Sequence, residues 1–273
     1  MIEGAILLVG CGKMGGALLE GWFRHGLSPV DVMVVEPAGR AMVLPAVDHP
    51  ALVVLENERQ IPTDFKPDVV VFAVKPQVLE QVIPHYRKFD SAGSLFLSIV
   101  AGKPISAYTS VLGEKAAVVR AMPNTPAAVS RGVSVLFAAP TVAPSQKRVC
   151  TVLLGSVGEV AWIDDEEFMD AVTAVSGSGP AYVFLLAECL AEAGKRAGLP
   201  PDLAESLGRL TVSGAGVLMD SSEESASELR RNVTSPGGTT QAALEVLMGN
   251  DALESLLSEA VTAAVRKSRE LAG

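Results

Sequence analysis

The segment Val9-Gly10-Cys11-Gly12-Lys13-Met14-Gly15 decides the fold of this chain. It follows a short apolar run, Ala5 to Val9, and leads into a helical pattern from Ala17 to His25. In such a segment the first glycine permits a tight turn, the second lets the backbone approach a pyrophosphate, and the third lets strand and helix pack closely. The helix N-terminus then presents N–H groups to the phosphates. The segment therefore predicts a dinucleotide site that includes Gly10, Gly12, Lys13, Met14 and Gly15.

Short β-branched runs continue up to about residue 163 and alternate with helical stretches. The predicted strands are Ala5 to Val9, Val32 to Glu36, Ala51 to Leu55, Val69 to Val74, Leu95 to Val100, Ala117 to Ala121, Val133 to Phe137 and Glu159 to Ile163. This alternation is typical of βαβ units and a parallel sheet. Residues 1–163 are therefore predicted to form an α/β, Rossmann-type dinucleotide-binding domain.

After Asp164 the residue pattern changes to long segments rich in Ala, Leu and Glu, which are interrupted by turn residues such as Gly198 to Pro201. Residues 164–273 are therefore predicted to form an all-α C-terminal domain. Aromatic residues make up only 5% of the chain, so this half has few large side chains for a core of its own. We expect it to pack against another subunit, as a homodimer or a higher assembly of dimers.

Composition and charge exclude several classes of protein. Hydrophobic residues make up 49% of the chain, the mean hydropathy is +0.35, and the net charge is -9. No uninterrupted apolar run approaches the ~18 residues of a spanning helix, and the N-terminus lacks a secretion signal, so a cytoplasmic protein that does not cross a membrane is expected. The negative charge argues against binding to nucleic acid or to an anionic membrane.

The cysteines and histidines indicate no metal site. Three of each are present, widely spaced, and neither set has the spacing of zinc ligands. An odd number of dispersed thiols fits a reducing compartment better than a disulfide framework.

Glu36 lies at the end of the second predicted strand, about 20 residues after the glycines. A carboxylate there can accept hydrogen bonds from the adenosine ribose, which favours NAD over NADP. Arg40, four residues later, could instead meet a 2′-phosphate. Both NADP(H) and NAD(H) therefore remain open as cofactors.

Four further segments combine turn residues with strand or helix ends. They are Val71-Phe72-Ala73-Val74-Lys75-Pro76-Gln77, Arg120-Ala121-Met122-Pro123-Asn124-Thr125-Pro126, Val175-Ser176-Gly177-Ser178-Gly179-Pro180-Ala181-Tyr182 and Asn232-Val233-Thr234-Ser235-Pro236-Gly237-Gly238-Thr239-Thr240. The first two end strands, where open α/β sheets place their ligands. In the last, a Pro-Gly-Gly turn that opens a helix presents N–H groups and hydroxyls suited to a carboxylate.

Taken in order, the fingerprint and these four segments resemble the pyrroline-5-carboxylate reductase family. The resemblance implies hydride transfer from a reduced nicotinamide to the C=N carbon of 1-pyrroline-5-carboxylate, which gives L-proline. In one respect this sequence departs from many relatives that prefer the phosphorylated cofactor. The acidic Glu36 stands where those relatives carry small or basic residues.

The family pattern also implies the remaining site residues. Further contacts to the cofactor are expected from Asn57, Ala73, Val74, Lys75, Pro76, Ala101, Met122 and Asn124. The substrate carboxylate is expected at Ser235, Gly238, Thr239 and Thr240, and the Thr240 hydroxyl is expected to hydrogen-bond the ring nitrogen as the catalytic group. The family's helical halves interlock as dimers, so this loop acts either within one chain or across the interface.

Two other functions fit parts of this pattern. A 3-hydroxyacid dehydrogenase shares the same plan but needs a general base, usually a Lys on the helix after the domain switch, and residues 178–194 contain no Lys or His. A cofactor sensor without catalysis would keep the fold, but it has no need of the carboxylate-binding turn at Ser235 to Thr240.

Overall fold

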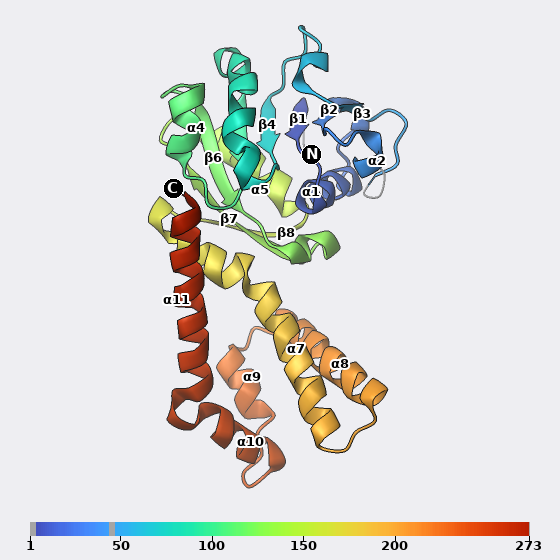
Figure 1. Ribbon diagram of the computed structural model, residues 1–273, viewed down its shortest axis with the longest axis vertical. Coiled ribbons are helices and arrows are strands. Elements are labelled where there is room, and N and C mark those ends of the chain that lie inside the picture. The colour runs from blue at the N-terminus through green and yellow to red at the C-terminus, as the bar shows by residue number, and fades with distance from the viewer. Residues whose placement is uncertain (1–3, 44–46, 273) are drawn as a thin grey trace. The chain divides into compact units, whose positions relative to one another are not determined.

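The computed structural model describes residues 4–43 and 47–272 (Figure 1). Its described strands form one eight-stranded sheet in the order β3-β2-β1-β4-β5-β6-β7-β8. The strands are β1 Ile6–Val9, β2 Val32–Val35, β3 Val53–Leu55, β4 Val69–Phe72, β5 Leu95–Ser98, β6 Ala117–Met122, β7 Gly132–Ala138 and β8 Gly158–Trp162. All of the predicted strands are present, so the sequence prediction of an α/β domain is confirmed.

Strands β1, β2, β4 and β5 are buried along their whole length. Their residues are nearly all apolar, as expected for a sheet whose two faces are both covered by helices. Successive crossovers lead outward from β1 to β3 on one side and from β4 to β6 on the other. Because crossovers are right-handed, this reversal puts their helices on opposite faces and makes the carboxyl ends of β1 and β4 the expected binding position.

The sheet is not parallel throughout, which corrects the sequence prediction. Strands β1 to β6 are parallel in the order described above, but β7 pairs antiparallel with β6, with Arg120 opposite Phe137. The connection of residues 123–131 contains only a short 3₁₀ turn, Thr125–Val129. A parallel return needs a crossover of about a dozen residues or more, so a chain this short must reverse direction. Strand β8 then pairs parallel with β7 through helix α5, Pro144–Gly155.

Helix α1, Lys13–Arg24, starts within the glycine segment, directly after Gly12, rather than at Ala17. The sequence pattern missed its first turn because Gly15 and Gly16 carry no side chain that could mark a helical face. The buried Trp22 secures the helix, since its Nε1 donates to the Leu153 carbonyl in α5 at 2.9 Å. The other helices around the sheet are α2 Arg40–Val43, α3 Leu79–Val82, α4 Ile105–Leu112 and α6 Met169–Val172.

The chain divides into two compact units, one of residues Met1–Gly177 with Val265–Gly273 and one of Ser178–Ala264. The second contains α7 Gly179–Arg196, α8 Pro201–Asp220, α9 Ala226–Asn232 and α10 Thr239–Met248, and α11 Ala252–Ala272 leads back to the first. This confirms the predicted all-α region. Helices α7 and α8 cross closely, because a Cβ on Gly208 would lie 2.7 Å from the Ala187 carbonyl oxygen.

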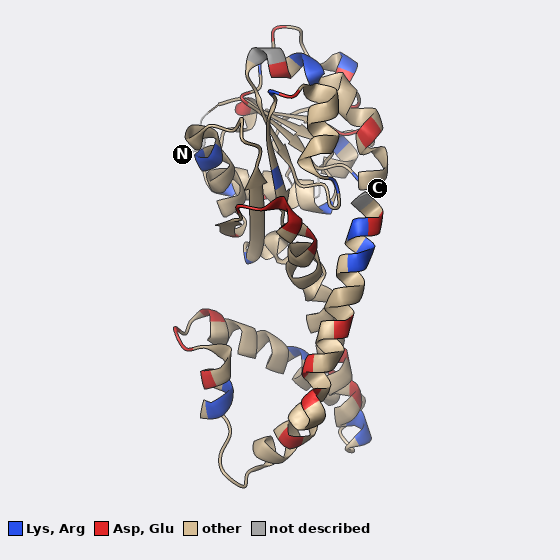
Figure 2. Cartoon of the chain, turned by 90° about the vertical axis from the view of Figure 1, so that its left-hand side faces the viewer, with Lys and Arg blue, Asp and Glu red and all other residues tan. Residues whose placement is uncertain are grey.

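The helices of this second unit expose many large apolar side chains. Among them are Phe184 at 63%, Leu210 at 62% and Val217 at 66% exposure. Figure 2 shows that long stretches of these helices carry neither basic nor acidic residues. Such faces are expected where another protein chain covers them.

One helical stretch, Glu166–Arg196, is long and apolar enough by composition to cross a membrane. The prediction from the sequence missed this stretch because it considered only uninterrupted apolar runs. A mean hydropathy over a window also accepts small and polar residues between the apolar ones. Only 11% of its most apolar window is buried within this chain. A helix that packs against a partner subunit has the same composition, and length alone does not separate the two.

Candidate active site

The glycine segment forms a cradle at the carboxyl end of β1. Gly10 has φ +86°, and a Cβ there would lie 2.9 Å from the Ala73 carbonyl oxygen in the neighbouring strand connection. A Cβ on Gly15 would lie 2.8 Å from the Gly10 carbonyl oxygen. Both positions thus require glycine for the turn and for close packing of α1 on the sheet, as the sequence predicted.

Gly12 has a different surrounding, because a Cβ built on it meets no atom within 4 Å. Gly12 is the N-cap of α1, and among the residues that the structure describes no side chain caps that helix end. The N–H groups of the first turn therefore face open space at the positive end of the helix dipole. This geometry fits the pyrophosphate of a dinucleotide, with Lys13 exposed beside it.

The thiol of Cys11 stays neutral in this cradle. Burial and the nearby Glu36 carboxylate raise its pKa to about 12. At neutral pH the loop therefore carries no thiolate that would repel a phosphate.

Glu36 closes the other side of the cradle at the end of β2. Its Oε2 accepts the Cys11 N–H at 2.8 Å, and its Oε1 accepts the Ala38 N–H at 3.1 Å. Two backbone N–H groups that could bind the 2′-phosphate of NADP are thus already paired with the Glu36 carboxylate. Arg40 is engaged elsewhere, because its guanidinium donates to the carbonyls of Leu52 at 2.9 Å and His49 at 2.7 Å.

The other predicted cofactor residues follow the carboxyl ends of the parallel strands. Asn57 follows β3, Ala73, Val74, Lys75 and Pro76 follow β4, Ala101 follows β5, and Met122 and Asn124 end and follow β6, while Met14 packs against the core from α1. The structure therefore brings all of them to the same edge of the sheet as the glycine cradle.

Asn124 is held from two sides. Its Oδ1 accepts the Val133 N–H at 2.9 Å, and its Nδ2 donates to the Ser176 hydroxyl at 3.3 Å. Ser176 belongs to a π-helical turn, Thr173–Gly177, in which a Cβ on Gly177 would collide with the Met122 methyl group. The sequence marked this segment only by its small residues. The structure shows that they let the turn approach the end of β6.

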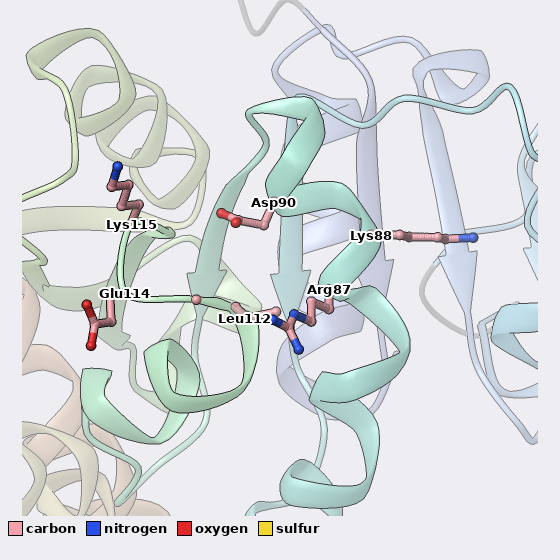
Figure 3. Close-up of a pocket in the computed structure, with 7 residues that line it drawn as sticks. Arg87, Lys88, Asp90, Leu112, Glu114 and Lys115 are labelled. Atoms are coloured by element: carbon pink, nitrogen blue, oxygen red, sulfur yellow. The ribbon is translucent and has the colours of Figure 1, made fainter.

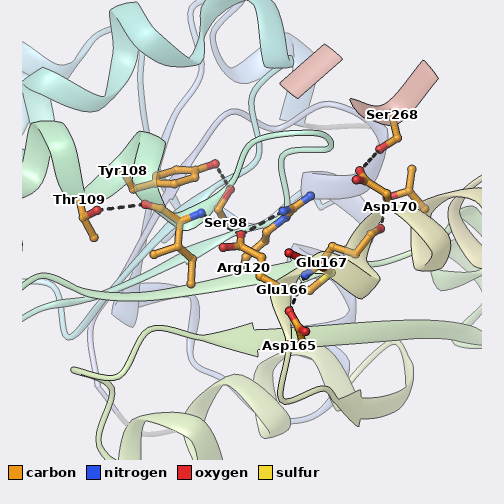
Figure 4. Close-up of polar contacts among 12 residues, drawn as sticks. Ser98, Tyr108, Thr109, Arg120, Asp165, Glu166, Glu167, Asp170 and Ser268 are labelled. Carbon is orange, nitrogen blue, oxygen red and sulfur yellow. Dashed lines mark hydrogen bonds and ion pairs between the residues drawn. The ribbon is translucent and has the colours of Figure 1, made fainter. Parts of the chain in front are cut away.

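Figure 4 shows a network of polar side chains around Arg120, to whose members the sequence assigned no role. Arg120, only 7% exposed, donates from Nη1 to Oε1 of Glu166 at 3.0 Å. The same Oε1 accepts the N–H of Ile105 at 2.9 Å. Nearby, the hydroxyls of Ser98 and Tyr108 share a hydrogen bond, and burial raises the pKa of Tyr108, so its phenol stays protonated.

The segment Ser235–Thr240 forms a turn that opens helix α10. Gly237 has φ +69°, and the Gly238 N–H donates to the Ser235 carbonyl at 3.0 Å. Within the described part of the chain, the N–H groups of Thr239 and Thr240 have no acceptor. Of the three N–H groups predicted to bind the carboxylate, those of Thr239 and Thr240 are therefore available, whereas the Gly238 N–H holds the turn itself.

The first unit contains a cavity of about 610 Å³, whose lining side chains Figure 3 shows. It is lined by Arg87, Lys88, Asp90, Leu112, Gly113, Glu114 and Lys115, which precede strands β5 and β6 or end α4. It therefore opens at the amino edge of the sheet and includes none of the predicted site residues. Among the residues that the structure describes, no cluster of His, Cys, Asp or Glu could hold a metal ion.

Strand order, glycine cradle and the residues gathered at the carboxyl edge define a nicotinamide-dependent oxidoreductase. Comparison with known proteins agrees. Residues 5–102 match the family model described as NADP oxidoreductase, coenzyme F420-dependent, and residues 166–271 match the model for pyrroline-5-carboxylate reductase dimerisation.

Similar proteins specify the family. A pyrroline-5-carboxylate reductase of Pseudomonas aeruginosa is 39% identical over 98% of this chain and 96% of its own length. A structure of a pyrroline-5-carboxylate reductase from Coxiella burnetii has a TM-score of 0.91 at 35% identity, and covers 99% of both chains. The Plasmodium falciparum pyrroline carboxylate reductase with NADP bound has a TM-score of 0.82 at 28% identity, over 100% of both chains. This chain belongs to the pyrroline-5-carboxylate reductase family.

Proposed function

We propose that this chain reduces the C=N bond of 1-pyrroline-5-carboxylate to give L-proline in the cytoplasm, with NADH or NADPH as the hydride donor. The observation that carries the proposal is the 39% identity to a reductase over 98% of the chain, which spans both units. The open cradle at Gly12 supports a dinucleotide site, and the N–H groups at the start of α10, which have no acceptor among the described residues, support a site for a carboxylate.

Positioning dominates this reaction. The reduced nicotinamide supplies a hydride when bound, so the chain must hold the imine carbon at about 3 to 3.5 Å from the donor carbon. The N–H groups of Thr239 and Thr240, with the Ser235 hydroxyl, bind the substrate carboxylate at the positive end of α10. Gly238 contributes by shaping the turn.

The Thr240 hydroxyl donates a hydrogen bond to the ring nitrogen. Within the described residues this hydroxyl has no other partner, so it is free to meet the substrate. A threonine hydroxyl is too weak an acid to be the final proton source at neutral pH. Solvent therefore supplies the proton, and Thr240 orients the imine and stabilises the charge that develops on its nitrogen.

An assay with purified protein tests this function. The protein is mixed with 1-pyrroline-5-carboxylate and either NADH or NADPH, and the loss of reduced nicotinamide and the formation of proline are both followed. We expect equal amounts of cofactor consumed and proline formed. A folded sample that forms no proline with either cofactor would disprove the proposal.

We further propose that NADH is the preferred donor, because Glu36 already occupies the N–H groups of Cys11 and Ala38, and its charge would repel a 2′-phosphate. Replacing Glu36 with Ser is expected to shift relative kcat/KM toward NADPH by about tenfold, or ~1.4 kcal/mol. The ratio of kcat/KM for the two cofactors measures this. Glu20→Ser removes one charge from α1 and serves as the control. An unchanged ratio in Glu36→Ser would show that Glu36 does not face the ribose.

Residues 164–273 are proposed to form the dimerisation and substrate domain, since their model match is to a dimerisation region and their apolar faces are exposed. The expected assembly is a homodimer or a set of dimers. Light scattering at micromolar concentration should give at least twice the 28.4 kDa mass of one chain. A monomeric mass would contradict the assignment.

A further inference from the structure

Glu166 lies outside the proposed cofactor and substrate contacts, yet its carboxylate joins two elements that lead to them. Its Oε1 accepts from Arg120 in β6 at 3.0 Å and from the N–H of Ile105, the first residue of α4, at 2.9 Å (Figure 4). Helix α4 has Pro104 as its N-cap, which offers no capping side chain. Glu166 therefore takes the place of an N-cap, although it is far away in the sequence.

Each element held by Glu166 continues into residues expected from the sequence to contact the cofactor. The loop of residues 99–104 contains Ala101 and ends directly at Ile105. Strand β6 continues from Arg120 to Met122, and Asn124 follows. One carboxylate thus connects the start of α4 with the strand that leads to Met122 and Asn124.

The loop of residues 99–104 has other supports that limit how it could move. Lys103 pairs with Glu80 at 2.9 Å, and a Cβ on Gly102 would touch the Leu271 side chain at 3.5 Å. At its start, the Val100 N–H donates to the Ser98 hydroxyl at 3.1 Å. The end of the loop at Ile105 is held by Glu166.

The electrostatics make this link specific to a carboxylate. Arg120 is 7% exposed, so its charge needs a counter-ion, which the partly buried Glu166 supplies, and charge-assisted hydrogen bonds are the stronger kind. A neutral replacement keeps at most a weaker contact to each donor. Loss of Glu166 therefore releases the start of α4 and leaves Arg120 without its counter-ion, while β6 itself stays paired with β5 and β7.

We propose that Glu166 is a positioning residue for the nicotinamide end of the cofactor, because it ties the end of the 99–104 loop to the Arg120 side chain of β6. The proposal rests on the assignment of Ala101, Met122 and Asn124 to that end of the site. It predicts that variants of Glu166 lose affinity for the nicotinamide half of the cofactor and keep affinity for the adenosine half.

The test compares binding of NADH and of ADP-ribose, which lacks the nicotinamide, by titration calorimetry without substrate. Glu166→Gln keeps the side-chain size and one acceptor. Glu166→Ala combined with Arg120→Met also removes the buried charge that would otherwise be left unpaired, and so restores stability without restoring the link. In the double variant we expect Kd for NADH to rise about tenfold, Kd for ADP-ribose to stay within about twofold, and the melting temperature to exceed that of Glu166→Ala alone.

Glu167→Gln is the matched control. It also removes one carboxylate charge, but from the exposed side chain of the next residue. It should bind both ligands as the unaltered protein does. Equal weakening of NADH and ADP-ribose, or unchanged binding of NADH in the double variant, would overturn the proposal. If the double variant does not fold, the ratio of Kd for NADH to Kd for ADP-ribose in Glu166→Gln decides the question. Reductase activity of the unaltered protein is measured separately, so a failure here leaves the proposed function standing.

Discussion

Gly12→Val is expected to abolish useful cofactor binding while the fold survives. The Gly12 backbone, with φ -70° and ψ -164°, is accessible to any residue, and a Cβ there meets no atom within 4 Å. The valine methyl groups instead fill the space over the N-terminus of α1, where the pyrophosphate is proposed to sit. Kd for NADH should rise at least about a hundredfold, or ~2.7 kcal/mol. The melting temperature without ligand should fall by no more than about 4 °C.

Gly15→Val provides the contrast. Its Cβ would lie 2.8 Å from the Gly10 carbonyl oxygen, so the helix must move off the strand. This variant should lose stability and cofactor affinity together, whereas Gly12→Val loses affinity alone. A Gly12→Val protein that binds NADH with full affinity would show that the phosphates lie elsewhere.

Thr240→Ala is expected to lower kcat by about ten- to a hundredfold, the equivalent of ~1.4 to 2.7 kcal/mol. The change removes a hydroxyl but keeps the N–H groups that hold the carboxylate, so binding of the substrate largely survives. A hydrogen bond that strengthens as charge shifts onto the ring nitrogen acts mainly on the chemical step. KM for the reduced cofactor should scarcely move. Steady-state kinetics with both substrates varied measures these effects.

Two neighbouring variants separate the roles within the loop. Thr239→Ala removes the adjacent hydroxyl and should leave kcat nearly unchanged. Gly238→Val places a Cβ 3.1 Å from the Ser235 carbonyl oxygen, so the turn must shift and KM for 1-pyrroline-5-carboxylate should rise more than kcat falls. If Thr240→Ala keeps full kcat and weakens only cofactor binding, the loop belongs to the dinucleotide site and the proposed substrate pocket is wrong.

The sequence predicted every strand of the sheet, because local hydrophobic runs and turn residues set the strand positions. It missed the reversal at β7, although the short connection of residues 123–131 contained the necessary signal. Chain length between strands limits their direction, and the pattern of apolar residues does not. The start of α1 was missed for a related reason, since glycines carry no periodic side chain.

Residue contacts across long sequence separations could not be predicted in the same way. Arg120 and Glu166 are 46 residues apart, and nothing in either neighbourhood marks them as partners. Arg40 stood at a plausible position for a phosphate, but the carbonyls of His49 and Leu52 take its guanidinium. The residues of the glycine cradle were predictable because the chemistry of a tight turn next to phosphate requires glycine itself.

The exposed apolar faces of α7 and α8 have a consequence for every stability measurement described above. When subunits cover such faces, folding and association share one equilibrium, and the unfolding midpoint rises with protein concentration by mass action. A variant studied in a more dilute sample would then look less stable even if its contacts were unchanged. Melting temperatures of variants and controls are therefore comparable only at one fixed subunit concentration.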